Sequence, residues 1–180
     1  MMTGSAAMLE CTGAVDREGS VMDEHVIRKQ LEALVLGEGA HVPLERALDG
    51  LPAGLRGKRP TGLAHSVWEL LEHIRIAQED LLQYALDPDW VSPSWPDGYW
   101  PADPAPASAQ AWDQSLDAFR RGRDEALALL RDSERDLTAP IPHAGRHTLV
   151  RQLMLLADHN AYHGAQIVDV RRALGAWPPG

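Results

Sequence analysis

The sequence predicts an all-α protein, a four-helix bundle with one long crossover between its second and third helices. Four stretches repeat apolar residues at helical spacing, and hardly any stretch alternates apolar and polar residues as a half-buried strand does. A connection rich in proline and tryptophan, residues 87–108, separates the second stretch from the third. Its proline density forbids a regular helix, so a bundle built from these stretches contains one long crossover.

The first predicted helix covers residues 23–39, and Gly37 and Gly39 end it. Its apolar residues recur at spacings of three and four: Val26, Ile27, Leu31, Leu34 and Val35. A short helical piece follows and stops at Gly50 and Pro52. Residues 1–21 are small, polar and aperiodic, so we expect a flexible tail there and one domain over residues 22–180.

The second predicted helix has a strong start signal, because Ser66 and Glu69 match the capping box. Its apolar face runs to an end near Asp87 and consists of Val67, Leu70, Leu71, Ile74, Ala77, Leu81 and Leu82. The crossover that follows carries four large aromatic residues, Trp90, Trp95, Tyr99 and Trp100. Rings of this kind are seldom left in water, so we expect this loop to lie against the body of the protein.

The third predicted helix spans residues 108–132, with Trp112, Leu116, Phe119, Ala126, Leu127 and Leu130 on its inner side. The fourth begins after Thr148 as its N-cap and ends before Gly175. Its inner stripe alternates steps of four and three, as a bundle seam does: Leu149, Leu153, Leu156, Asn160, His163, Ile167, Val170 and Leu174.

Composition and charge exclude several classes of protein. The 180 residues carry a formal net charge of −9, so the basic surface that a nucleic acid requires is missing. No apolar run approaches the length of a membrane span. The single cysteine, Cys11, excludes an internal disulfide framework, and no secretory signal is evident, so we expect a cytoplasmic protein.

Two histidines four residues apart, His159 and His163, indicate a metal site on the fourth helix. Residues i and i+4 lie about 40° apart around a helix and about 6 Å apart along it, so their imidazoles can converge on one ion. His73, on the apolar face of the second helix, is the best third ligand. The alternative is that these are ordinary core histidines, hydrogen-bonded to carbonyls or amides.

The remaining histidines are weaker candidates. His65 precedes the capping serine and could line an entrance, whereas His41, His143 and His147 belong to loops. Neither an HExxH motif nor paired Glu-x-x-His motifs occur, and glycine-rich phosphate loops are also absent from the sequence.

The stretches "HSVWELLEHIRIAQEDLL" and "LLADHNAYHGAQIVDVRRALGAWPP" resemble the DinB/YfiT-like superfamily. The resemblance covers about Asp23 to Pro179 and implies a four-helix bundle with a divalent metal ion held by three histidines, here His73, His159 and His163. It also implies a homodimer. Characterised members of the family include transferases and isomerases that use thiols such as bacillithiol or mycothiol.

We therefore expect a metal-dependent enzyme, a thiol S-transferase acting on small electrophiles, with zinc or nickel as the ion. Metal-bound water or thiolate would carry the reaction, and Asn160, Tyr162 and Gln166 are candidates for surrounding polar contacts. A hydrolase is the first alternative, although Asp158 and Glu72 point away from the adjacent histidines. The second is a metal- or ligand-binding stress-response protein without turnover. The path of the Trp90–Trp100 loop should distinguish an enzyme, which needs an open cleft to the metal, from a binding protein, whose site this loop would close.

Overall fold

The computed structural model describes residues 17–179. Over these residues the chain forms five α-helices: α1 (Arg17–Leu36), α2 (Leu44–Leu48), α3 (Val67–Leu86), α4 (Ala109–Arg131) and α5 (Leu149–Ala173). Two 3-10 turns, Ala53–Leu55 and Asp97–Tyr99, lie in the connections. No strand occurs in this range, where a single antiparallel bridge joins Pro140 to Thr148. The prediction of an all-α fold is confirmed.

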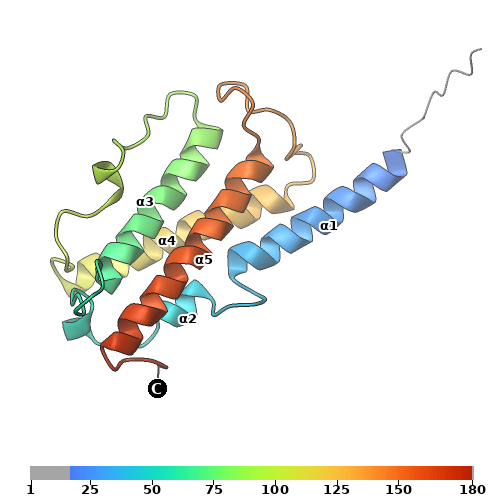
Figure 1. Cartoon of the computed structure of the whole chain (residues 1–180). Helices are drawn as coiled ribbons and strands as arrows, with labels where there is room; N and C mark the ends of the chain where they lie inside the picture. The colour runs from blue at the N-terminus through green and yellow to red at the C-terminus, as the bar shows by residue number, and fades with distance from the viewer. Residues whose placement is uncertain (1–16, 180) are drawn as a thin grey trace, which may run out of the picture.

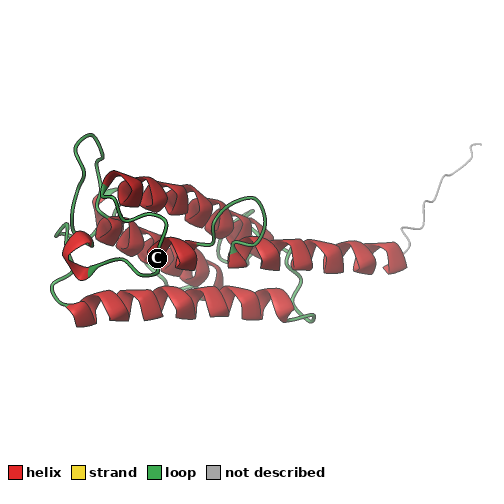
Figure 2. Cartoon of the chain, turned by 90° about the horizontal axis from the view of Figure 1, so that it is seen from below, coloured by secondary structure: helices red, strands yellow, loops and turns green. Residues whose placement is uncertain are grey.

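Four long helices pack against one another, and the short α2 packs against α5 (Figure 1). Helix α3 contacts both α5 and α4, and α1 contacts α4 and α5. Helices α3 and α5 run in opposite directions, so the first turns of α3 lie beside the last turns of α5 (Figure 1). The N-terminal part of α1 extends beyond the ends of the other helices (Figure 2).

Side-chain caps start three of the four long helices, α3, α4 and α5, as local sequence signals predict. The Ser66 hydroxyl accepts from the Glu69 N–H at 3.1 Å, and the Glu69 carboxylate accepts from the Ser66 N–H at 2.8 Å. Ser108 and Thr148 cap α4 and α5 in the same way through their hydroxyl groups. A cap of this kind stabilises a helix by about 1 kcal/mol.

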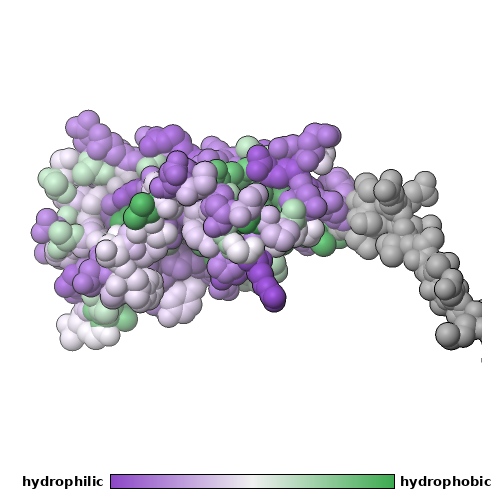
Figure 3. Space-filling model, turned by 90° about the horizontal axis from the view of Figure 1, so that it is seen from above, coloured by the Kyte–Doolittle hydropathy of each residue, from purple (hydrophilic) through white to green (hydrophobic). Residues whose placement is uncertain are grey.

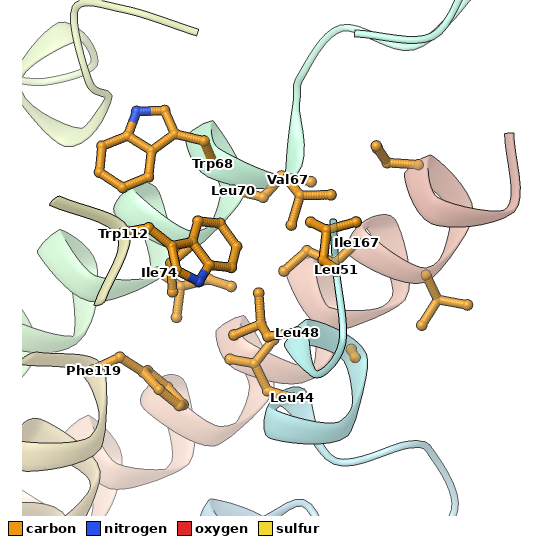
Figure 4. Packing of buried hydrophobic residues seen from close by; sticks show 14 residues of the cluster. Leu44, Leu48, Leu51, Val67, Trp68, Leu70, Ile74, Trp112, Phe119 and Ile167 are labelled. Carbon is orange, nitrogen blue, oxygen red and sulfur yellow. The ribbon is translucent and has the colours of Figure 1, made fainter. Parts of the chain in front are cut away.

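The interior contains two hydrophobic clusters, which follow one another along the length of the helices. One joins α2 to the first half of α3 and to Trp112, Phe119 and Ile167 (Figure 4). The other joins α1 to the opposite ends of α3, α4 and α5 through Leu31, Val35, Leu82, Leu130 and Leu153.

A buried polar layer lies between these clusters along the helices. The Gln78 side chain donates to the Phe119 carbonyl at 2.8 Å and accepts from the Asn160 amide at 3.2 Å. A Cβ at residue 122 would lie 2.3 Å from Gln78 Nε2, so glycine is needed there to admit the amide. Gln78 thus connects α3 to α4 through the Phe119 carbonyl and to α5 through Asn160.

Helix α1 differs from its sequence-based description in two ways. It begins at Arg17, inside the predicted tail, while residues 1–16 with Cys11 lie outside the described range. Leu31 and Val35 are buried, but Val26, Ile27 and Leu34 are about half exposed, because the other helices cover only one edge of the apolar stripe.

Hydrophilic residues dominate the face drawn in Figure 3, with scattered hydrophobic ones among them. Among the described helices, none combines the length and the apolar character that spanning a bilayer requires.

Candidate metal centre

Three histidine rings meet between α3 and α5. His73 lies in the second turn of α3, and His159 and His163 lie one turn apart in the middle of α5. The ring centroids are 4.8 Å apart for His73 and His159, 4.6 Å for His73 and His163, and 4.5 Å for His159 and His163. One ring nitrogen from each residue lies within 4.8 Å of the other two. The fold thus brings together the three histidines that the sequence singles out.

The protonation of His73 is fixed by a backbone carbonyl. Its Nδ1 lies 2.9 Å from the Tyr99 carbonyl oxygen, which can only accept, so the ring proton is on Nδ1. Nε2 then carries the lone pair and lies within hydrogen-bond distance of His159 Nε2, at 3.1 Å. Two nitrogens about 2.0–2.1 Å from a tetrahedral zinc ion would be roughly 3.3 Å apart, so the observed spacing suits an ion of this size.

The protonation of His163 is fixed by Gln166. His163 Nδ1 donates to Gln166 Oε1 at 2.7 Å, which leaves Nε2 without a proton. Tyr162 is 63% exposed and presents its ring edge-on to His163, with centroids 4.9 Å apart. Of the three polar residues considered from the sequence, Gln166 hydrogen-bonds to the site, Tyr162 packs beside it, and Asn160 hydrogen-bonds to Gln78 instead.

Trp100 of the crossover loop completes a stack of three rings with His65 and His73. Trp100 is sandwiched between His73, at 3.9 Å and an interplanar angle of 2°, and His65, at 4.1 Å and 12°. His73 is therefore held from one side by the Tyr99 carbonyl and over its ring face by the Trp100 indole. Neither contact has a signal in the sequence, because both depend on the path of an irregular loop.

Asp80 of α3 fastens this loop to the helix. Its carboxylate accepts from the Trp90 indole N–H at 2.8 Å and from the Tyr99 hydroxyl at 2.7 Å. Burial, followed by the Asp80 carboxylate, raises the pKa of Tyr99 to about 12, so the phenol remains a hydrogen-bond donor. The expectation that the loop packs against the body holds for Trp90, Tyr99 and Trp100, whereas Trp95 is 79% exposed.

Burial keeps the three imidazoles neutral. It lowers the pKa of His73, against the opposing effect of the Tyr99 carbonyl, and it lowers the pKa of His163 against the effect of Gln166. The pKa of His159 falls to about 4, first through burial and then through the neighbouring His163 and His73. A histidine must be unprotonated to bind a metal ion, so this environment favours the ligand form at neutral pH.

Two hollows flank the centre and share His65 as a wall. The larger, of about 470 Å³, is also lined by Arg59 and Trp100, and the smaller, of about 270 Å³, by Leu70 and Gln166. Trp100 touches His73 and Gln166 touches His163, so each hollow reaches a residue that contacts the centre.

The cluster among the described residues consists of imidazoles alone. Glu72, next to His73 in sequence, is held by the Arg75 guanidinium through contacts of 2.9 and 3.0 Å, and Asp158 is exposed. Three neutral nitrogen donors suit several first-row divalent ions. The donor set therefore fits a divalent metal ion, with no carboxylate of α3 or α5 in the cluster.

Three other histidines, His41, His143 and His147, make contacts in loops. His147 Nδ1 lies 2.9 Å from the Tyr84 hydroxyl, and His143 Nε2 lies 3.0 Å from the Tyr84 carbonyl, so both tie the segment before α5 to the end of α3. His41 Nδ1 lies 3.1 Å from the Val42 carbonyl.

Comparison with known proteins identifies the family. A family model described as the DinB superfamily matches residues 39–167, which include all three histidines of the centre. Comparison with curated proteins and with solved structures gives no match. The family match spans most of the chain, from the segment before α2 to the penultimate turns of α5. The chain belongs to the DinB superfamily.

Proposed function

We propose that this protein is a divalent-metal-dependent thiol S-transferase that acts on small electrophiles. The observation that carries the proposal is the convergence of three neutral imidazoles, two of which have their outer nitrogen occupied by a protein acceptor. His73, His159 and His163 would hold the ion, and Gln166 and the Tyr99 carbonyl would orient two of the rings. Such outer hydrogen bonds are a recurrent feature of metal-binding histidines.

Zinc or nickel is the ion that we propose. When bound by three imidazoles, such an ion supplies Lewis acidity and lowers the pKa of a water molecule or thiol at a remaining coordination position. The chain's own contribution is to keep the rings neutral through burial and to fix their orientation.

We favour transfer over hydrolysis because neither carboxylate next to the histidines in sequence is placed to act as the base of a hydrolase. A hydrolase normally requires a general base near the attacking water. Glu72 is engaged by Arg75, and Asp158 faces solvent, so neither is available as that base. In the proposed reaction the thiol sulfur forms a bond to the carbon of the electrophile, the carbon–leaving-group bond breaks, and the thiol proton and leaving group depart. The hollows that share His65 offer room for the two reactants.

A metal-binding protein without turnover is the second candidate. The stacking of Trp100 on the His73 ring favours it, because an indole over one ligand narrows the approach to the centre. The two candidates make the same prediction for metal content and opposite predictions for activity.

The metal is tested by elemental analysis of protein purified without a nickel column. We expect about one divalent ion per chain in the wild type. The His163→Ala variant should lose most of it, whereas His143→Ala, which alters an exposed loop histidine, should keep it. A wild-type protein that contains no metal and takes up neither zinc nor nickel on titration would contradict both candidates.

The reaction is tested with bacillithiol, mycothiol and glutathione, using monochlorobimane as an electrophile that becomes fluorescent when a thioether forms. We expect turnover by the wild type that His163→Ala abolishes and His143→Ala preserves. Metal-loaded wild type that is inactive with all three thiols and with a panel of further electrophiles would favour the binding protein.

We further propose that the four long helices form the DinB-type bundle and that the protein is a homodimer. Half-exposed Val26, Ile27 and Leu34 on α1 and exposed Met154 and Leu155 on the contacting helix α5 support an interface there. Light scattering of the wild type and of a Val26→Lys, Leu34→Lys variant tests it, with monomeric wild type as the contrary result.

A further inference from the structure

A third hollow, of about 600 Å³, lies away from the histidines. It opens between α2 and the first half of α4, and it shares no lining residue with the two hollows beside His65. Leu48, Leu51, Leu116 and the largely buried Trp112 form an apolar part of its lining. Figure 4 shows Trp112 in the core close to Leu48 and Leu51, so this wall is part of the rigid interior.

Arg56 gives this hollow an unpaired positive group. Its guanidinium carbon lies 4.5 Å from the centroid of the Trp112 ring, and its Nε is buried without a hydrogen-bond partner. Among the described residues Arg56 forms no ion pair, whereas the other two arginines of the lining do. Arg46 lies 3.6 Å from Asp49, and Arg120 lies 3.4 Å from Glu45.

A guanidinium that lines a hollow and forms no ion pair among the described residues points to a negatively charged ligand there. Its Nε is buried, so such a ligand would meet the outer N–H groups of the guanidinium. The planar fork of an arginine matches a carboxylate, which it binds through two parallel hydrogen bonds.

The rest of the lining specifies the ligand further. Its three arginines are opposed by three acidic residues, Glu45, Asp49 and Asp113, so the lining has no net positive charge. These carboxylates would repel a doubly charged phosphate about twice as strongly as a singly charged carboxylate, so the lining favours a single negative charge at Arg56. Leu116, which is partly exposed, and the edges of the buried Leu48, Leu51 and Trp112 offer contact to an apolar body next to that charge.

From these observations we propose that the hollow beside Arg56 is a binding site for a small monocarboxylate with an apolar body. The carboxylate lies against the Arg56 guanidinium, and its apolar body lies against Trp112 and the neighbouring leucines. This site is independent of the metal centre, so the proposal does not rest on the proposed transferase activity.

Isothermal titration calorimetry of the full chain with benzoate tests the proposal. Benzamide serves as the uncharged isostere, and inorganic phosphate serves as an anion without an apolar group. We expect benzoate to bind at least tenfold more tightly than either. Arg56→Met keeps an apolar side chain over Trp112 but removes the charge, and it should weaken benzoate binding at least tenfold. The matched control is Arg121→Met, which changes the net charge equally at an exposed position of α4 outside the hollow.

Each further result has a defined meaning. Equal binding by the wild type and Arg56→Met, or equal binding of benzoate and benzamide, would overturn the proposal. Phosphate that binds as tightly as benzoate would overturn the assignment to an apolar carboxylate. Binding that disappears in His163→Ala would place the benzoate at the metal instead. Should Arg56→Met fail to fold, the benzoate–benzamide comparison on wild type and the weakened binding expected of Arg56→Lys decide the question.

Discussion

At the scale of single residues, the centre depends on groups that do not themselves bind metal. Gln166 accepts a hydrogen bond from His163 Nδ1 and so keeps the lone pair on Nε2. Replacing Gln166 with leucine preserves the size of the side chain but removes the acceptor. We expect the affinity for zinc to fall about 10- to 100-fold, as is typical for loss of such an outer hydrogen bond.

Competition with a fluorescent zinc chelator measures this affinity. Arg172→Ala, at an exposed position near the end of the same helix, serves as the control and should bind zinc like the wild type. Unchanged affinity in Gln166→Leu would mean that the His163 ring is oriented by its packing rather than by this hydrogen bond.

A second residue-scale prediction concerns the response to acid. The pKa of His159 is lowered to about 4 in the folded protein and is 6.5 for the unperturbed residue. Between these values the unfolded chain binds more protons than the folded chain. The free energy of unfolding of metal-free protein should therefore fall as the pH decreases from about 6.5 towards 4, and the contribution of His159 should be fully present above that range.

Urea denaturation in the presence of a chelator, at several pH values between 7 and 4.5, provides this curve. His159→Leu removes the titrating group and should make the curve flatter, while His143→Ala should leave it unchanged. An identical pH dependence in the wild type and His159→Leu would show that His159 is already exposed to solvent and titrates normally.

At the scale of secondary-structure elements, one carboxylate of α3 anchors two aromatic residues of the crossover loop. Asp80 accepts hydrogen bonds from Trp90 and Tyr99, and the Tyr99 carbonyl in turn accepts from His73. Asp80→Ala should release the loop, so we expect faster proteolysis between residues 87 and 108 and weaker zinc binding. Asp80→Asn keeps one acceptor oxygen and should have an intermediate effect.

Limited proteolysis with chymotrypsin measures the release directly, because Trp90 and Tyr99 are followed by residues other than proline and can be cleaved once they leave Asp80. Glu79→Gln, at an exposed neighbouring position of α3, should behave like the wild type. A loop that remains protected in Asp80→Ala would show that the stacking of Trp100 between His65 and His73 suffices to hold it.

The helices were predictable to the extent that their signals are local. Ser66, Ser108 and Thr148 cap the helices that the apolar periodicity predicts, because capping involves residues only three positions apart. The width of the buried stripe on α1 was not predictable, since it depends on which helices cover it. Val26 and Leu31 belong to the same periodic pattern, yet only Leu31 is buried.

The metal centre, too, was predictable only in part, where its signals are local. Spacing along α5 and the apolar face of α3 indicated His159, His163 and His73 as neighbours. The sequence did not indicate that Tyr99 would present its carbonyl to His73, or that Trp100 would stack on it. These contacts join residues far from His73 along the chain, and nothing in the periodicity of the loop encodes them. The unpaired Arg56 is likewise visible only once α2, α3 and α4 are packed.

At the scale of the whole molecule, the centre connects two helices that each contribute to both hydrophobic clusters. Helix α3 supplies Ile74 to one cluster and Leu82 to the other, and α5 supplies Ile167 and Leu156 in the same way. The polar layer of Gln78 and Asn160 separates the clusters, so α3 and α5 are held together there by hydrogen bonds instead of apolar contacts. An ion shared by His73, His159 and His163 would add a further connection between the same two helices.

Removal of that ion should therefore lower the thermal stability of the entire protein. Free zinc at 100 times its dissociation constant stabilises a folded protein by about 2.7 kcal/mol, provided that the unfolded chain does not bind it. For a chain of this length, about 1 kcal/mol corresponds to roughly 2–4 °C in Tm, so we expect a chelator to lower Tm by about 5–10 °C. Calorimetry of the wild type with zinc and with chelator measures the shift. The Tm of His163→Ala should be the same in both conditions, while His143→Ala should show the wild-type shift. A wild-type Tm that does not respond to zinc or chelator would mean that the three histidines stabilise the helix pair through their own packing and hydrogen bonds alone.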